Sequence, residues 1–115
     1  MTKDERLRKS ERLLERREFR QVYDQGQRKN FPLFTVFSLK TDLPRCRLGI
    51  TVTKQIGRAV VRNRCKRVVR EAFRRNKHLA SGSFDLVINV KRAMGDVECA
   101  AVEDQVKRLL SLLVP

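Results

Sequence analysis

Hydrophobic and polar positions recur along this chain with two different periods, and the period indicates which element each segment forms. Between residues 13 and 26, Phe19, Val22 and Tyr23 fall at helical spacings among charged side chains. Gly26 follows them, and glycine is favoured just past the end of a helix. The pattern predicts a short first helix that stops at Gly26.

Three later segments have the composition or the alternation of strands. Residues 31–40 (FPLFTVFSLK) are rich in β-branched and aromatic side chains, and residues 47–54 (RLGITVTK) place alternate apolar side chains on one side. The TDLPR between them contains turn residues, so these two strands are predicted to form an antiparallel hairpin. Residues 84–90 (FDLVINV) alternate as a further strand with a buried face.

From residue 56 or 57 to Asn76 the apolar period becomes helical. At about 100° per residue, apolar side chains gather on one side of this helix, with Phe73 at the margin. The apolar set is Val61, Cys65, Val68, Val69 and Ala72, and the opposite set is Asn63, Lys66, Arg67, Arg70 and Arg74, with Arg62 and Arg64 on the flanks. The pattern predicts a helix packed on the core with a cationic outer face.

The remaining elements complete a single small domain. A last helix is predicted to begin at an N-cap, Asp96, and to bury a stripe of Val102, Val106, Leu109 and Leu113. The order helix, strand, strand, helix, strand, helix is typical of the α+β class, here a two-layer sandwich of helices on a sheet. The 115 residues suffice for one domain, and the polar residues 1–14 are predicted to be a flexible N-terminal segment.

The charge of the chain makes a polyanion its expected partner. It contains 27 Lys and Arg against 13 Asp and Glu, a formal net charge of +14 with a pI near 10.9, and nucleic acid is the leading candidate. No run approaches the roughly 20 apolar residues that span a bilayer. The N-terminal stretch lacks the apolar core of a secretory signal. We therefore expect a cytoplasmic protein without a membrane partner.

No constellation for protein-based catalysis is visible in the sequence. Cys46, Cys65 and Cys99 lie far apart and there is a single histidine, so we expect at least half-buried free thiols and no metal-ligating residues. Paired acids, a histidine-based triad and a phosphate-binding glycine loop are not visible. Asp85 stands alone on its strand, and Glu71 lies among arginines, where a local salt bridge is its simplest role. We predict no catalytic residue.

The cationic helix is the most informative feature for function. Residues 54–77 contain ten cations and one acid. A solvated helix face is the competing interpretation, but it suits mixed charge better than nearly single-sign charge. Arginine predominates, and its planar fork matches phosphate better than a lysine does. Asn63 offers a contact to a base edge or is simply an exposed amide. We predict RNA contacts from Arg58, Arg62, Asn63, Arg64, Lys66, Arg67, Arg70 and Arg74.

Aromatic side chains indicate a second surface. Phe19 and Tyr23 are one turn apart on the first predicted helix, and Phe37 lies on the following strand. Unpaired bases stack on such rings with about 1–3 kcal/mol per base. Packing in the core is the other interpretation and stays open for Tyr23 and Phe37. Arg28 and Lys54 are positioned along the chain to line the same groove.

The stretch KQIGRAVVRNRCKRVVREAF resembles the signature of the protein subunit of bacterial ribonuclease P. That signature is a lysine near a strand end, a glycine, an alanine, an Arg-Asn-Arg triplet, a Lys-Arg pair and a further arginine. The matching residues are Lys54, Gly57, Ala59, Arg62, Asn63, Arg64, Lys66, Arg67 and Arg70. RREFRQVYDQGQR also resembles the first helix of the family, and the element order agrees from about residue 12 onward.

The resemblance implies a fold and two RNA contacts. It implies a four-stranded sheet, with a brief strand beyond those predicted, and a left-handed strand–helix–strand crossover against the usual rule, as in a ribosomal protein domain. The Arg-Asn-Arg helix would dock on a catalytic RNA. A cleft between the first helix and the sheet would hold the single-stranded 5′ leader of precursor tRNA, at Phe19, Tyr23, Arg28, Phe37 and Lys54. Tyr23 stands where phenylalanine is common in the family, and Gln55 stands where a second lysine is frequent. These two departures are expected to weaken contacts with the leader or the catalytic RNA slightly.

In the family the RNA catalyses the hydrolysis with bound Mg2+, and the protein supplies charge and substrate contacts. The resemblance therefore implies Mg2+ held mainly by RNA, no cofactor for the isolated protein and no obligate protein partner. One rival is a structural RNA-binding protein of ribosomal type without a substrate groove, which the aromatic positions disfavour. Another is a DNA-binding regulator, disfavoured because the helix displays few base-reading amides.

Overall fold

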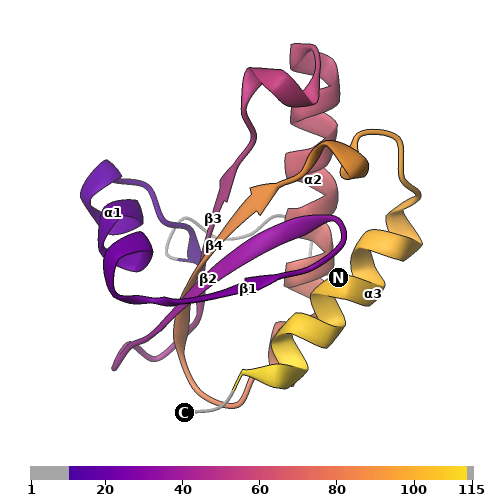
Figure 1. Cartoon of the computed structure of the whole chain (residues 1–115). Coiled ribbons are helices and arrows are strands. Elements are labelled where there is room, and N and C mark those ends of the chain that lie inside the picture. The colour runs from indigo at the N-terminus through magenta and orange to yellow at the C-terminus, as the bar shows by residue number, and fades with distance from the viewer. Residues whose placement is uncertain (1–10, 114–115) are drawn as a thin grey trace, which may run out of the picture.

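A computed structural model describes residues 11–113 (Figure 1). The chain forms α1 (Arg16–Gln25), β1 (Gln27–Asn30), β2 (Phe34–Lys40), β3 (Arg47–Thr51), α2 (Ala59–Asn76), β4 (Phe84–Val90) and α3 (Cys99–Leu112). Short 3-10 turns, η2 (Lys54–Ile56), η3 (Lys77–Leu79) and η4 (Arg92–Met94), follow β3, α2 and β4. The predicted α+β class and element order are confirmed, and α1 ends at Gly26 as expected.

The four strands form one mixed sheet in the order β1-β2-β4-β3. β4 pairs antiparallel with β2 and parallel with β3, so the predicted hairpin between residues 31–40 and 47–54 is wrong. Alternation shows which face of a strand is buried, but it does not show which strand lies beside it. β4 lies between β2 and β3, and six of its seven residues are buried, whereas β1 is exposed throughout and forms an edge. β1 is the brief fourth strand.

Helices lie on both faces of the sheet (Figure 1). α2 and α3 cover one face, where the largest fully buried side chains include Phe34, Leu86 and Ile88. α1 lies on the other face, where Val22 packs with Val87 of β4. The two-layer sandwich therefore has an additional small helical layer, and β3, α2 and β4 form a parallel crossover.

The inner face of α2 agrees with the predicted pattern, but the helix begins later. Gly57 has φ 153°, a conformation that side chains disfavour, and residues 54–56 form the separate turn η2. α2 therefore starts at Ala59 rather than at residue 56 or 57. Phe73, expected at the margin, is fully buried together with Cys65 and Val69. This burial orients the opposite, cationic side of α2 toward solvent.

The N-terminal and C-terminal parts depart from simple sequence patterns. α3 has Glu98 rather than Asp96 as its N-cap, because the N–H of Val97 donates to the carbonyl of Met94 at 3.2 Å and extends the preceding turn.

Within the segment predicted to be flexible, Leu13 is 5% exposed. The rest of that segment, residues 1–10, lies outside the described residues. In residues 11–113, no helix is both long and apolar enough to cross a membrane.

Candidate nucleic-acid interface

The outer face of α2 is cationic and open to solvent. Arg58, Asn63, Arg67 and Arg70 are exposed, and Lys66 is half-buried. Within residues 11–113, the four cations among them, the three arginines and Lys66, do not pair with a carboxylate. Positive charge without internal compensation on a rigid helix attracts polyanions such as nucleic acid.

Two of the predicted arginines bind backbone carbonyls of the protein itself. Arg62 Nη1 donates to the carbonyl of Gly57 at 2.8 Å. Arg64 Nη2 donates to the carbonyl of Val97 at 2.8 Å, and its Nη1 reaches the carbonyl of Gly95 at 3.4 Å. Arg62 therefore secures the turn before α2, and Arg64 secures the loop before α3. Their charges remain on the surface of α2, but part of each guanidinium is occupied.

The C-terminal part of α2 contains the one acid of this face. Glu71 forms salt bridges with Arg74 and with Arg75, whose Nε lies 3.2 Å from its carboxylate. The hydrogen bond from Arg74 is the main cause that lowers the pKa of Glu71. The predicted local salt bridge of Glu71 is confirmed. Of the predicted RNA-binding residues, Arg74 is therefore partly compensated inside the protein.

Tyr23 of α1 and Phe37 of β2, hereafter the aromatic pair, meet edge to face. Their ring centroids are 4.8 Å apart with an interplanar angle of 84°. The Tyr23 hydroxyl donates to Asn89 Oδ1 at 2.8 Å, so the Thr51 hydroxyl, 3.1 Å away, donates to the phenol oxygen. Both rings are half-buried, so each contributes to packing and also presents part of its surface. The hydroxyl of Tyr23 thus ties α1 to β3 and β4.

A polar row crosses the sheet beside the aromatic pair. Asn30, Thr35, Asn89 and Thr51 are successive register partners on β1, β2, β4 and β3. Directly paired residues point to the same face of a sheet, so these four side chains share the face on which α1 lies. The Thr35 hydroxyl donates to Asn30 Oδ1 at 2.8 Å. We did not predict this row, because its members come from four strands; the asparagine inside FDLVINV was its only local signal.

The other predicted cleft residues have different surroundings. Arg28 is exposed and is the register partner of Phe37, so its side chain starts on the same face. Lys54 is exposed in η2, just beyond the end of β3. Phe19 packs directly over Gly49, where a Cβ would come within 2.6 Å of the ring. Phe19 therefore holds α1 on the sheet, Arg28 is a positively charged neighbour of Phe37, and Lys54 adds charge three residues after Thr51 of the polar row.

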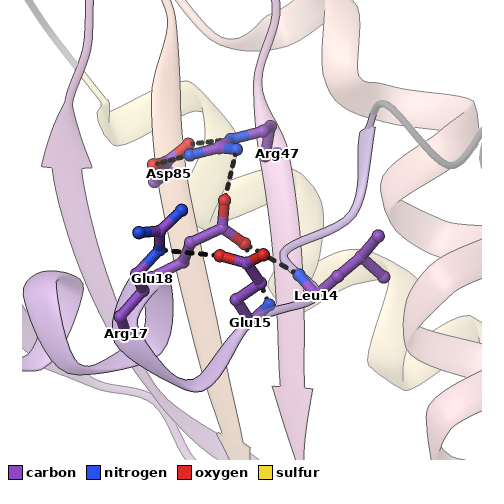
Figure 2. A network of polar contacts seen from close by, with 6 residues as sticks. All are labelled: Leu14, Glu15, Arg17, Glu18, Arg47 and Asp85. Atoms are coloured by element: carbon purple, nitrogen blue, oxygen red, sulfur yellow. Dashed lines mark hydrogen bonds and ion pairs between the residues drawn. The ribbon is translucent and has the colours of Figure 1, made fainter.

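A network of charged side chains secures the start of α1 (Figure 2). Arg47 of β3 donates from Nε and Nη2 to Asp85 of β4 at 2.9 and 2.7 Å, and from Nη1 to Glu18 at 3.0 Å. Glu18 Oε1 accepts the backbone N–H groups of Glu15 and Leu14, each at 3.0 Å. The Glu15 bond is the main cause that lowers the pKa of Glu18. Asp85, solitary in the sequence, finds its partner through strand register.

The cysteines differ in exposure. Cys65 is buried in the core and Cys46 is half-buried, but Cys99 is exposed at the first position of α3, where we expected a more buried thiol. All three are free. Among residues 11–113, no group of three or more His, Cys, Asp or Glu is placed to hold a metal ion.

Comparison with known proteins decides the family. The ribonuclease P family model matches residues 7–114. The chain belongs to the ribonuclease P protein family. The ribonuclease P protein component of Syntrophus aciditrophicus is 46% identical over 96 residues, which cover 84% of this chain and 81% of that relative.

Solved ribonuclease P proteins have the same architecture. The protein from Thermotoga maritima superposes with a TM-score of 0.83 at 33% identity, over 91% of this chain and 99% of that one. The protein from Staphylococcus aureus gives 0.81 at 26% identity, over 90% of this chain and 95% of that one. This ribonuclease P protein is therefore a subunit of a ribonucleoprotein enzyme of tRNA processing, and it associates with ribonuclease P RNA.

Proposed function

We propose that this ribonuclease P protein binds the catalytic RNA through the outer face of α2 and holds the 5′ leader of precursor tRNA over the aromatic pair and the polar row. The observation that supports the first contact is the set of α2 cations without carboxylate partners in residues 11–113: Arg58, Lys66, Arg67 and Arg70. Phosphates of a folded RNA supply the missing counter-charge, and arginine forks bind them through two hydrogen bonds.

The proposed leader contact rests on the chemistry beside α1. The aromatic pair presents ring surface on which an unpaired base can stack. In the polar row Asn30 is exposed and Asn89 and Thr51 are half-buried, so they offer amide and hydroxyl groups that suit base edges and the 2′-hydroxyl of single-stranded RNA. Arg28 and Lys54 add positive charge for the leader phosphates. A ribosomal-type RNA-binding protein would not need this combination in addition to its basic helix.

We assign no catalytic residue to the protein. In this proposal the RNA cleaves the phosphodiester bond, and the Mg2+ that assists the attack of water is held mainly by the RNA. The isolated protein requires no cofactor. Its cations replace part of the counterion atmosphere of the RNA and its substrate, so the protein lowers the Mg2+ concentration that cleavage requires.

Reconstitution with the ribonuclease P RNA of the same genome tests the function. We expect the wild-type protein to permit cleavage of precursor tRNA at the mature 5′ end at low Mg2+, where the RNA alone is slow. Arg67→Ala should weaken RNA binding and reduce the slope of log affinity against log salt by about one unit. Arg108→Ala removes an exposed arginine from α3 and is the matched control. Equal effects of the two variants would contradict the role of α2.

A second experiment addresses the leader. Phe37→Leu keeps an apolar side chain but removes the ring, and it should weaken binding of leader-bearing precursor about tenfold, equivalent to ~1.4 kcal/mol. Binding of mature tRNA should not change. Equal losses for both RNAs would indicate lost packing rather than a lost leader contact and would favour the ribosomal-type alternative. Duplex DNA should compete poorly with folded RNA, whereas a DNA-binding regulator would show the opposite order.

A further inference from the structure

The chain before α1 is attached to both β3 and the end of α2. Arg12 forms a parallel β-bridge with Leu48, and the N–H of Leu13 donates to the carbonyl of Leu48 at 3.0 Å. One residue earlier, the carboxylate of Glu11 forms an ion pair with Nζ of Lys77, directly after α2. Residues 11–13 therefore lie along the free edge of β3, next to α2.

The side-chain directions in this segment follow from its pairing. Leu13 packs into the cluster on the α1 side of the sheet, with Val22 and Val87. Leu48, the bridge partner of Arg12, belongs to the core on the α2 side, and bridged residues point to the same face. Successive residues of an extended segment point to opposite faces, so Arg12 points toward α2.

Arg12 lies near Arg70 there, and within residues 11–113 neither guanidinium pairs with a carboxylate. Its Nε is buried and has no hydrogen-bond partner. Arg70 lies on the neighbouring flank of α2 and is exposed as a whole residue. The pKa of its guanidinium is lowered, mainly by partial desolvation and secondly by the positive charge of Arg12. Lys66 lies one turn before Arg70. On this flank, within residues 11–113, the nearby carboxylate is that of Glu11, which is paired with Lys77.

We propose that Arg12 and Arg70 together bind one backbone phosphate of the partner RNA. This inference rests on the proposed function of α2 and extends its RNA-binding surface across the edge of β3 onto residues 11–13. Two guanidinium groups without a carboxylate between them repel each other in the free protein, and a phosphate placed between them would reverse the sign of that interaction. Arg12 is outside the signature stretch, and the β-bridge to Leu48 and the ion pair between Glu11 and Lys77 bring it to α2.

Inorganic phosphate and the protein alone provide the first test. Thermal unfolding of wild type, Arg12→Gln, Arg70→Gln and the double variant is compared in phosphate and in chloride of equal ionic strength. At phosphate equal to twice its dissociation constant, the wild-type midpoint should rise by about 3 °C. Each single variant should lose most of this rise, and the double variant should lose little more, because both arginines act on one ion. Arg108→Gln is the matched control, since phosphate also stabilises proteins nonspecifically.

Binding to ribonuclease P RNA provides the second test. Arg12→Gln should weaken binding about tenfold, the value of one charge-assisted hydrogen-bonded contact, and Arg12→Lys should restore part of the loss. A wild-type phosphate response that survives Arg12→Gln, or RNA affinity unchanged in that variant, would overturn the shared site. That result would leave the proposed function standing if wild-type protein still supports precursor cleavage. Failure of the wild-type protein to support cleavage would refute the proposed function. The phosphate response is measured without RNA, so it tests the shared site independently of that function.

Discussion

Removal of the negative charge of Asp85 tests how α1 is held on the sheet. Its side chain is 6% exposed and accepts two hydrogen bonds from Arg47, at 2.9 and 2.7 Å. Asp85→Asn preserves size but replaces one accepting oxygen by an amide that donates. Arg47, itself 22% exposed, then keeps Glu18 as its counter-charge, at 3.0 Å (Figure 2).

The expected loss of stability follows from this burial. Breaking one side of a buried ion pair costs about 3–5 kcal/mol. Because Arg47 reaches solvent and keeps Glu18, we expect the lower limit, ~3 kcal/mol. A domain of this size has about 5–15 kcal/mol of stability in total, so the thermal midpoint should fall by roughly 10–20 °C.

Urea unfolding followed by circular dichroism measures this loss directly. Asp85→Asn should lower the midpoint concentration and leave the slope m unchanged, since the same surface is exposed on unfolding. Asp104→Asn, at an exposed position of α3, is the control and should stay within about 0.5 kcal/mol of wild type. Replacing both Arg47 and Asp85 by leucine should recover most of the loss, because Glu18, the charge that then lacks Arg47, is 25% exposed and keeps its two backbone hydrogen bonds. A loss below about 1 kcal/mol for Asp85→Asn would refute the reasoning.

Three further measurements address packing, acid stability and thiol exposure. Gly49→Ala places a Cβ within 2.6 Å of the Phe19 ring, so it should cost about 1–3 kcal/mol in urea unfolding and weaken leader binding together with stability. Backbone hydrogen bonds hold the pKa of Glu18 below its ordinary 4.5. The ionised Glu18 therefore stabilises the fold fully above pH 4.5, and this contribution is lost as the pH falls through the lowered pKa. Glu18→Gln should flatten the curve of stability against pH below pH 4.5. Burial raises the pKa of Cys65, so mass spectrometry after brief alkylation should find the exposed Cys99 modified and Cys65 unmodified until the protein unfolds.

Helix α2 shows how much a local sequence pattern can determine. Its apolar period predicted the buried face, and the same period assigned the arginines to the outer side. A helix repeats every 3.6 residues whatever surrounds it, so side chains within it have known relative directions. The signature that starts at Lys54 and continues through α2 also led directly to the family, whose model matches residues 7–114.

Strand pairing was less predictable. The alternation of residues 47–54 correctly indicated a strand, but its neighbour is β4 and not β2. Local turn residues favoured a hairpin, whereas β4, with six of its seven residues buried, took the position between β2 and β3. The burial of β4 between two strands and under helices outweighs a short connection from β2 to β3, because apolar burial is the main favourable contribution to folding.

The sequence by itself determined the elements, the cationic face of α2 and the family of the protein, because these depend on residues close together in the chain or on a contiguous signature. Only the tertiary structure decided the order of the strands, and with it the polar row, the Arg47–Asp85 ion pair and the bridge to β3 that brings Arg12 near Arg70. Each of these joins residues far apart in sequence. Their proximity is set by which surfaces pack to exclude water, and that competition is settled over the whole chain at once.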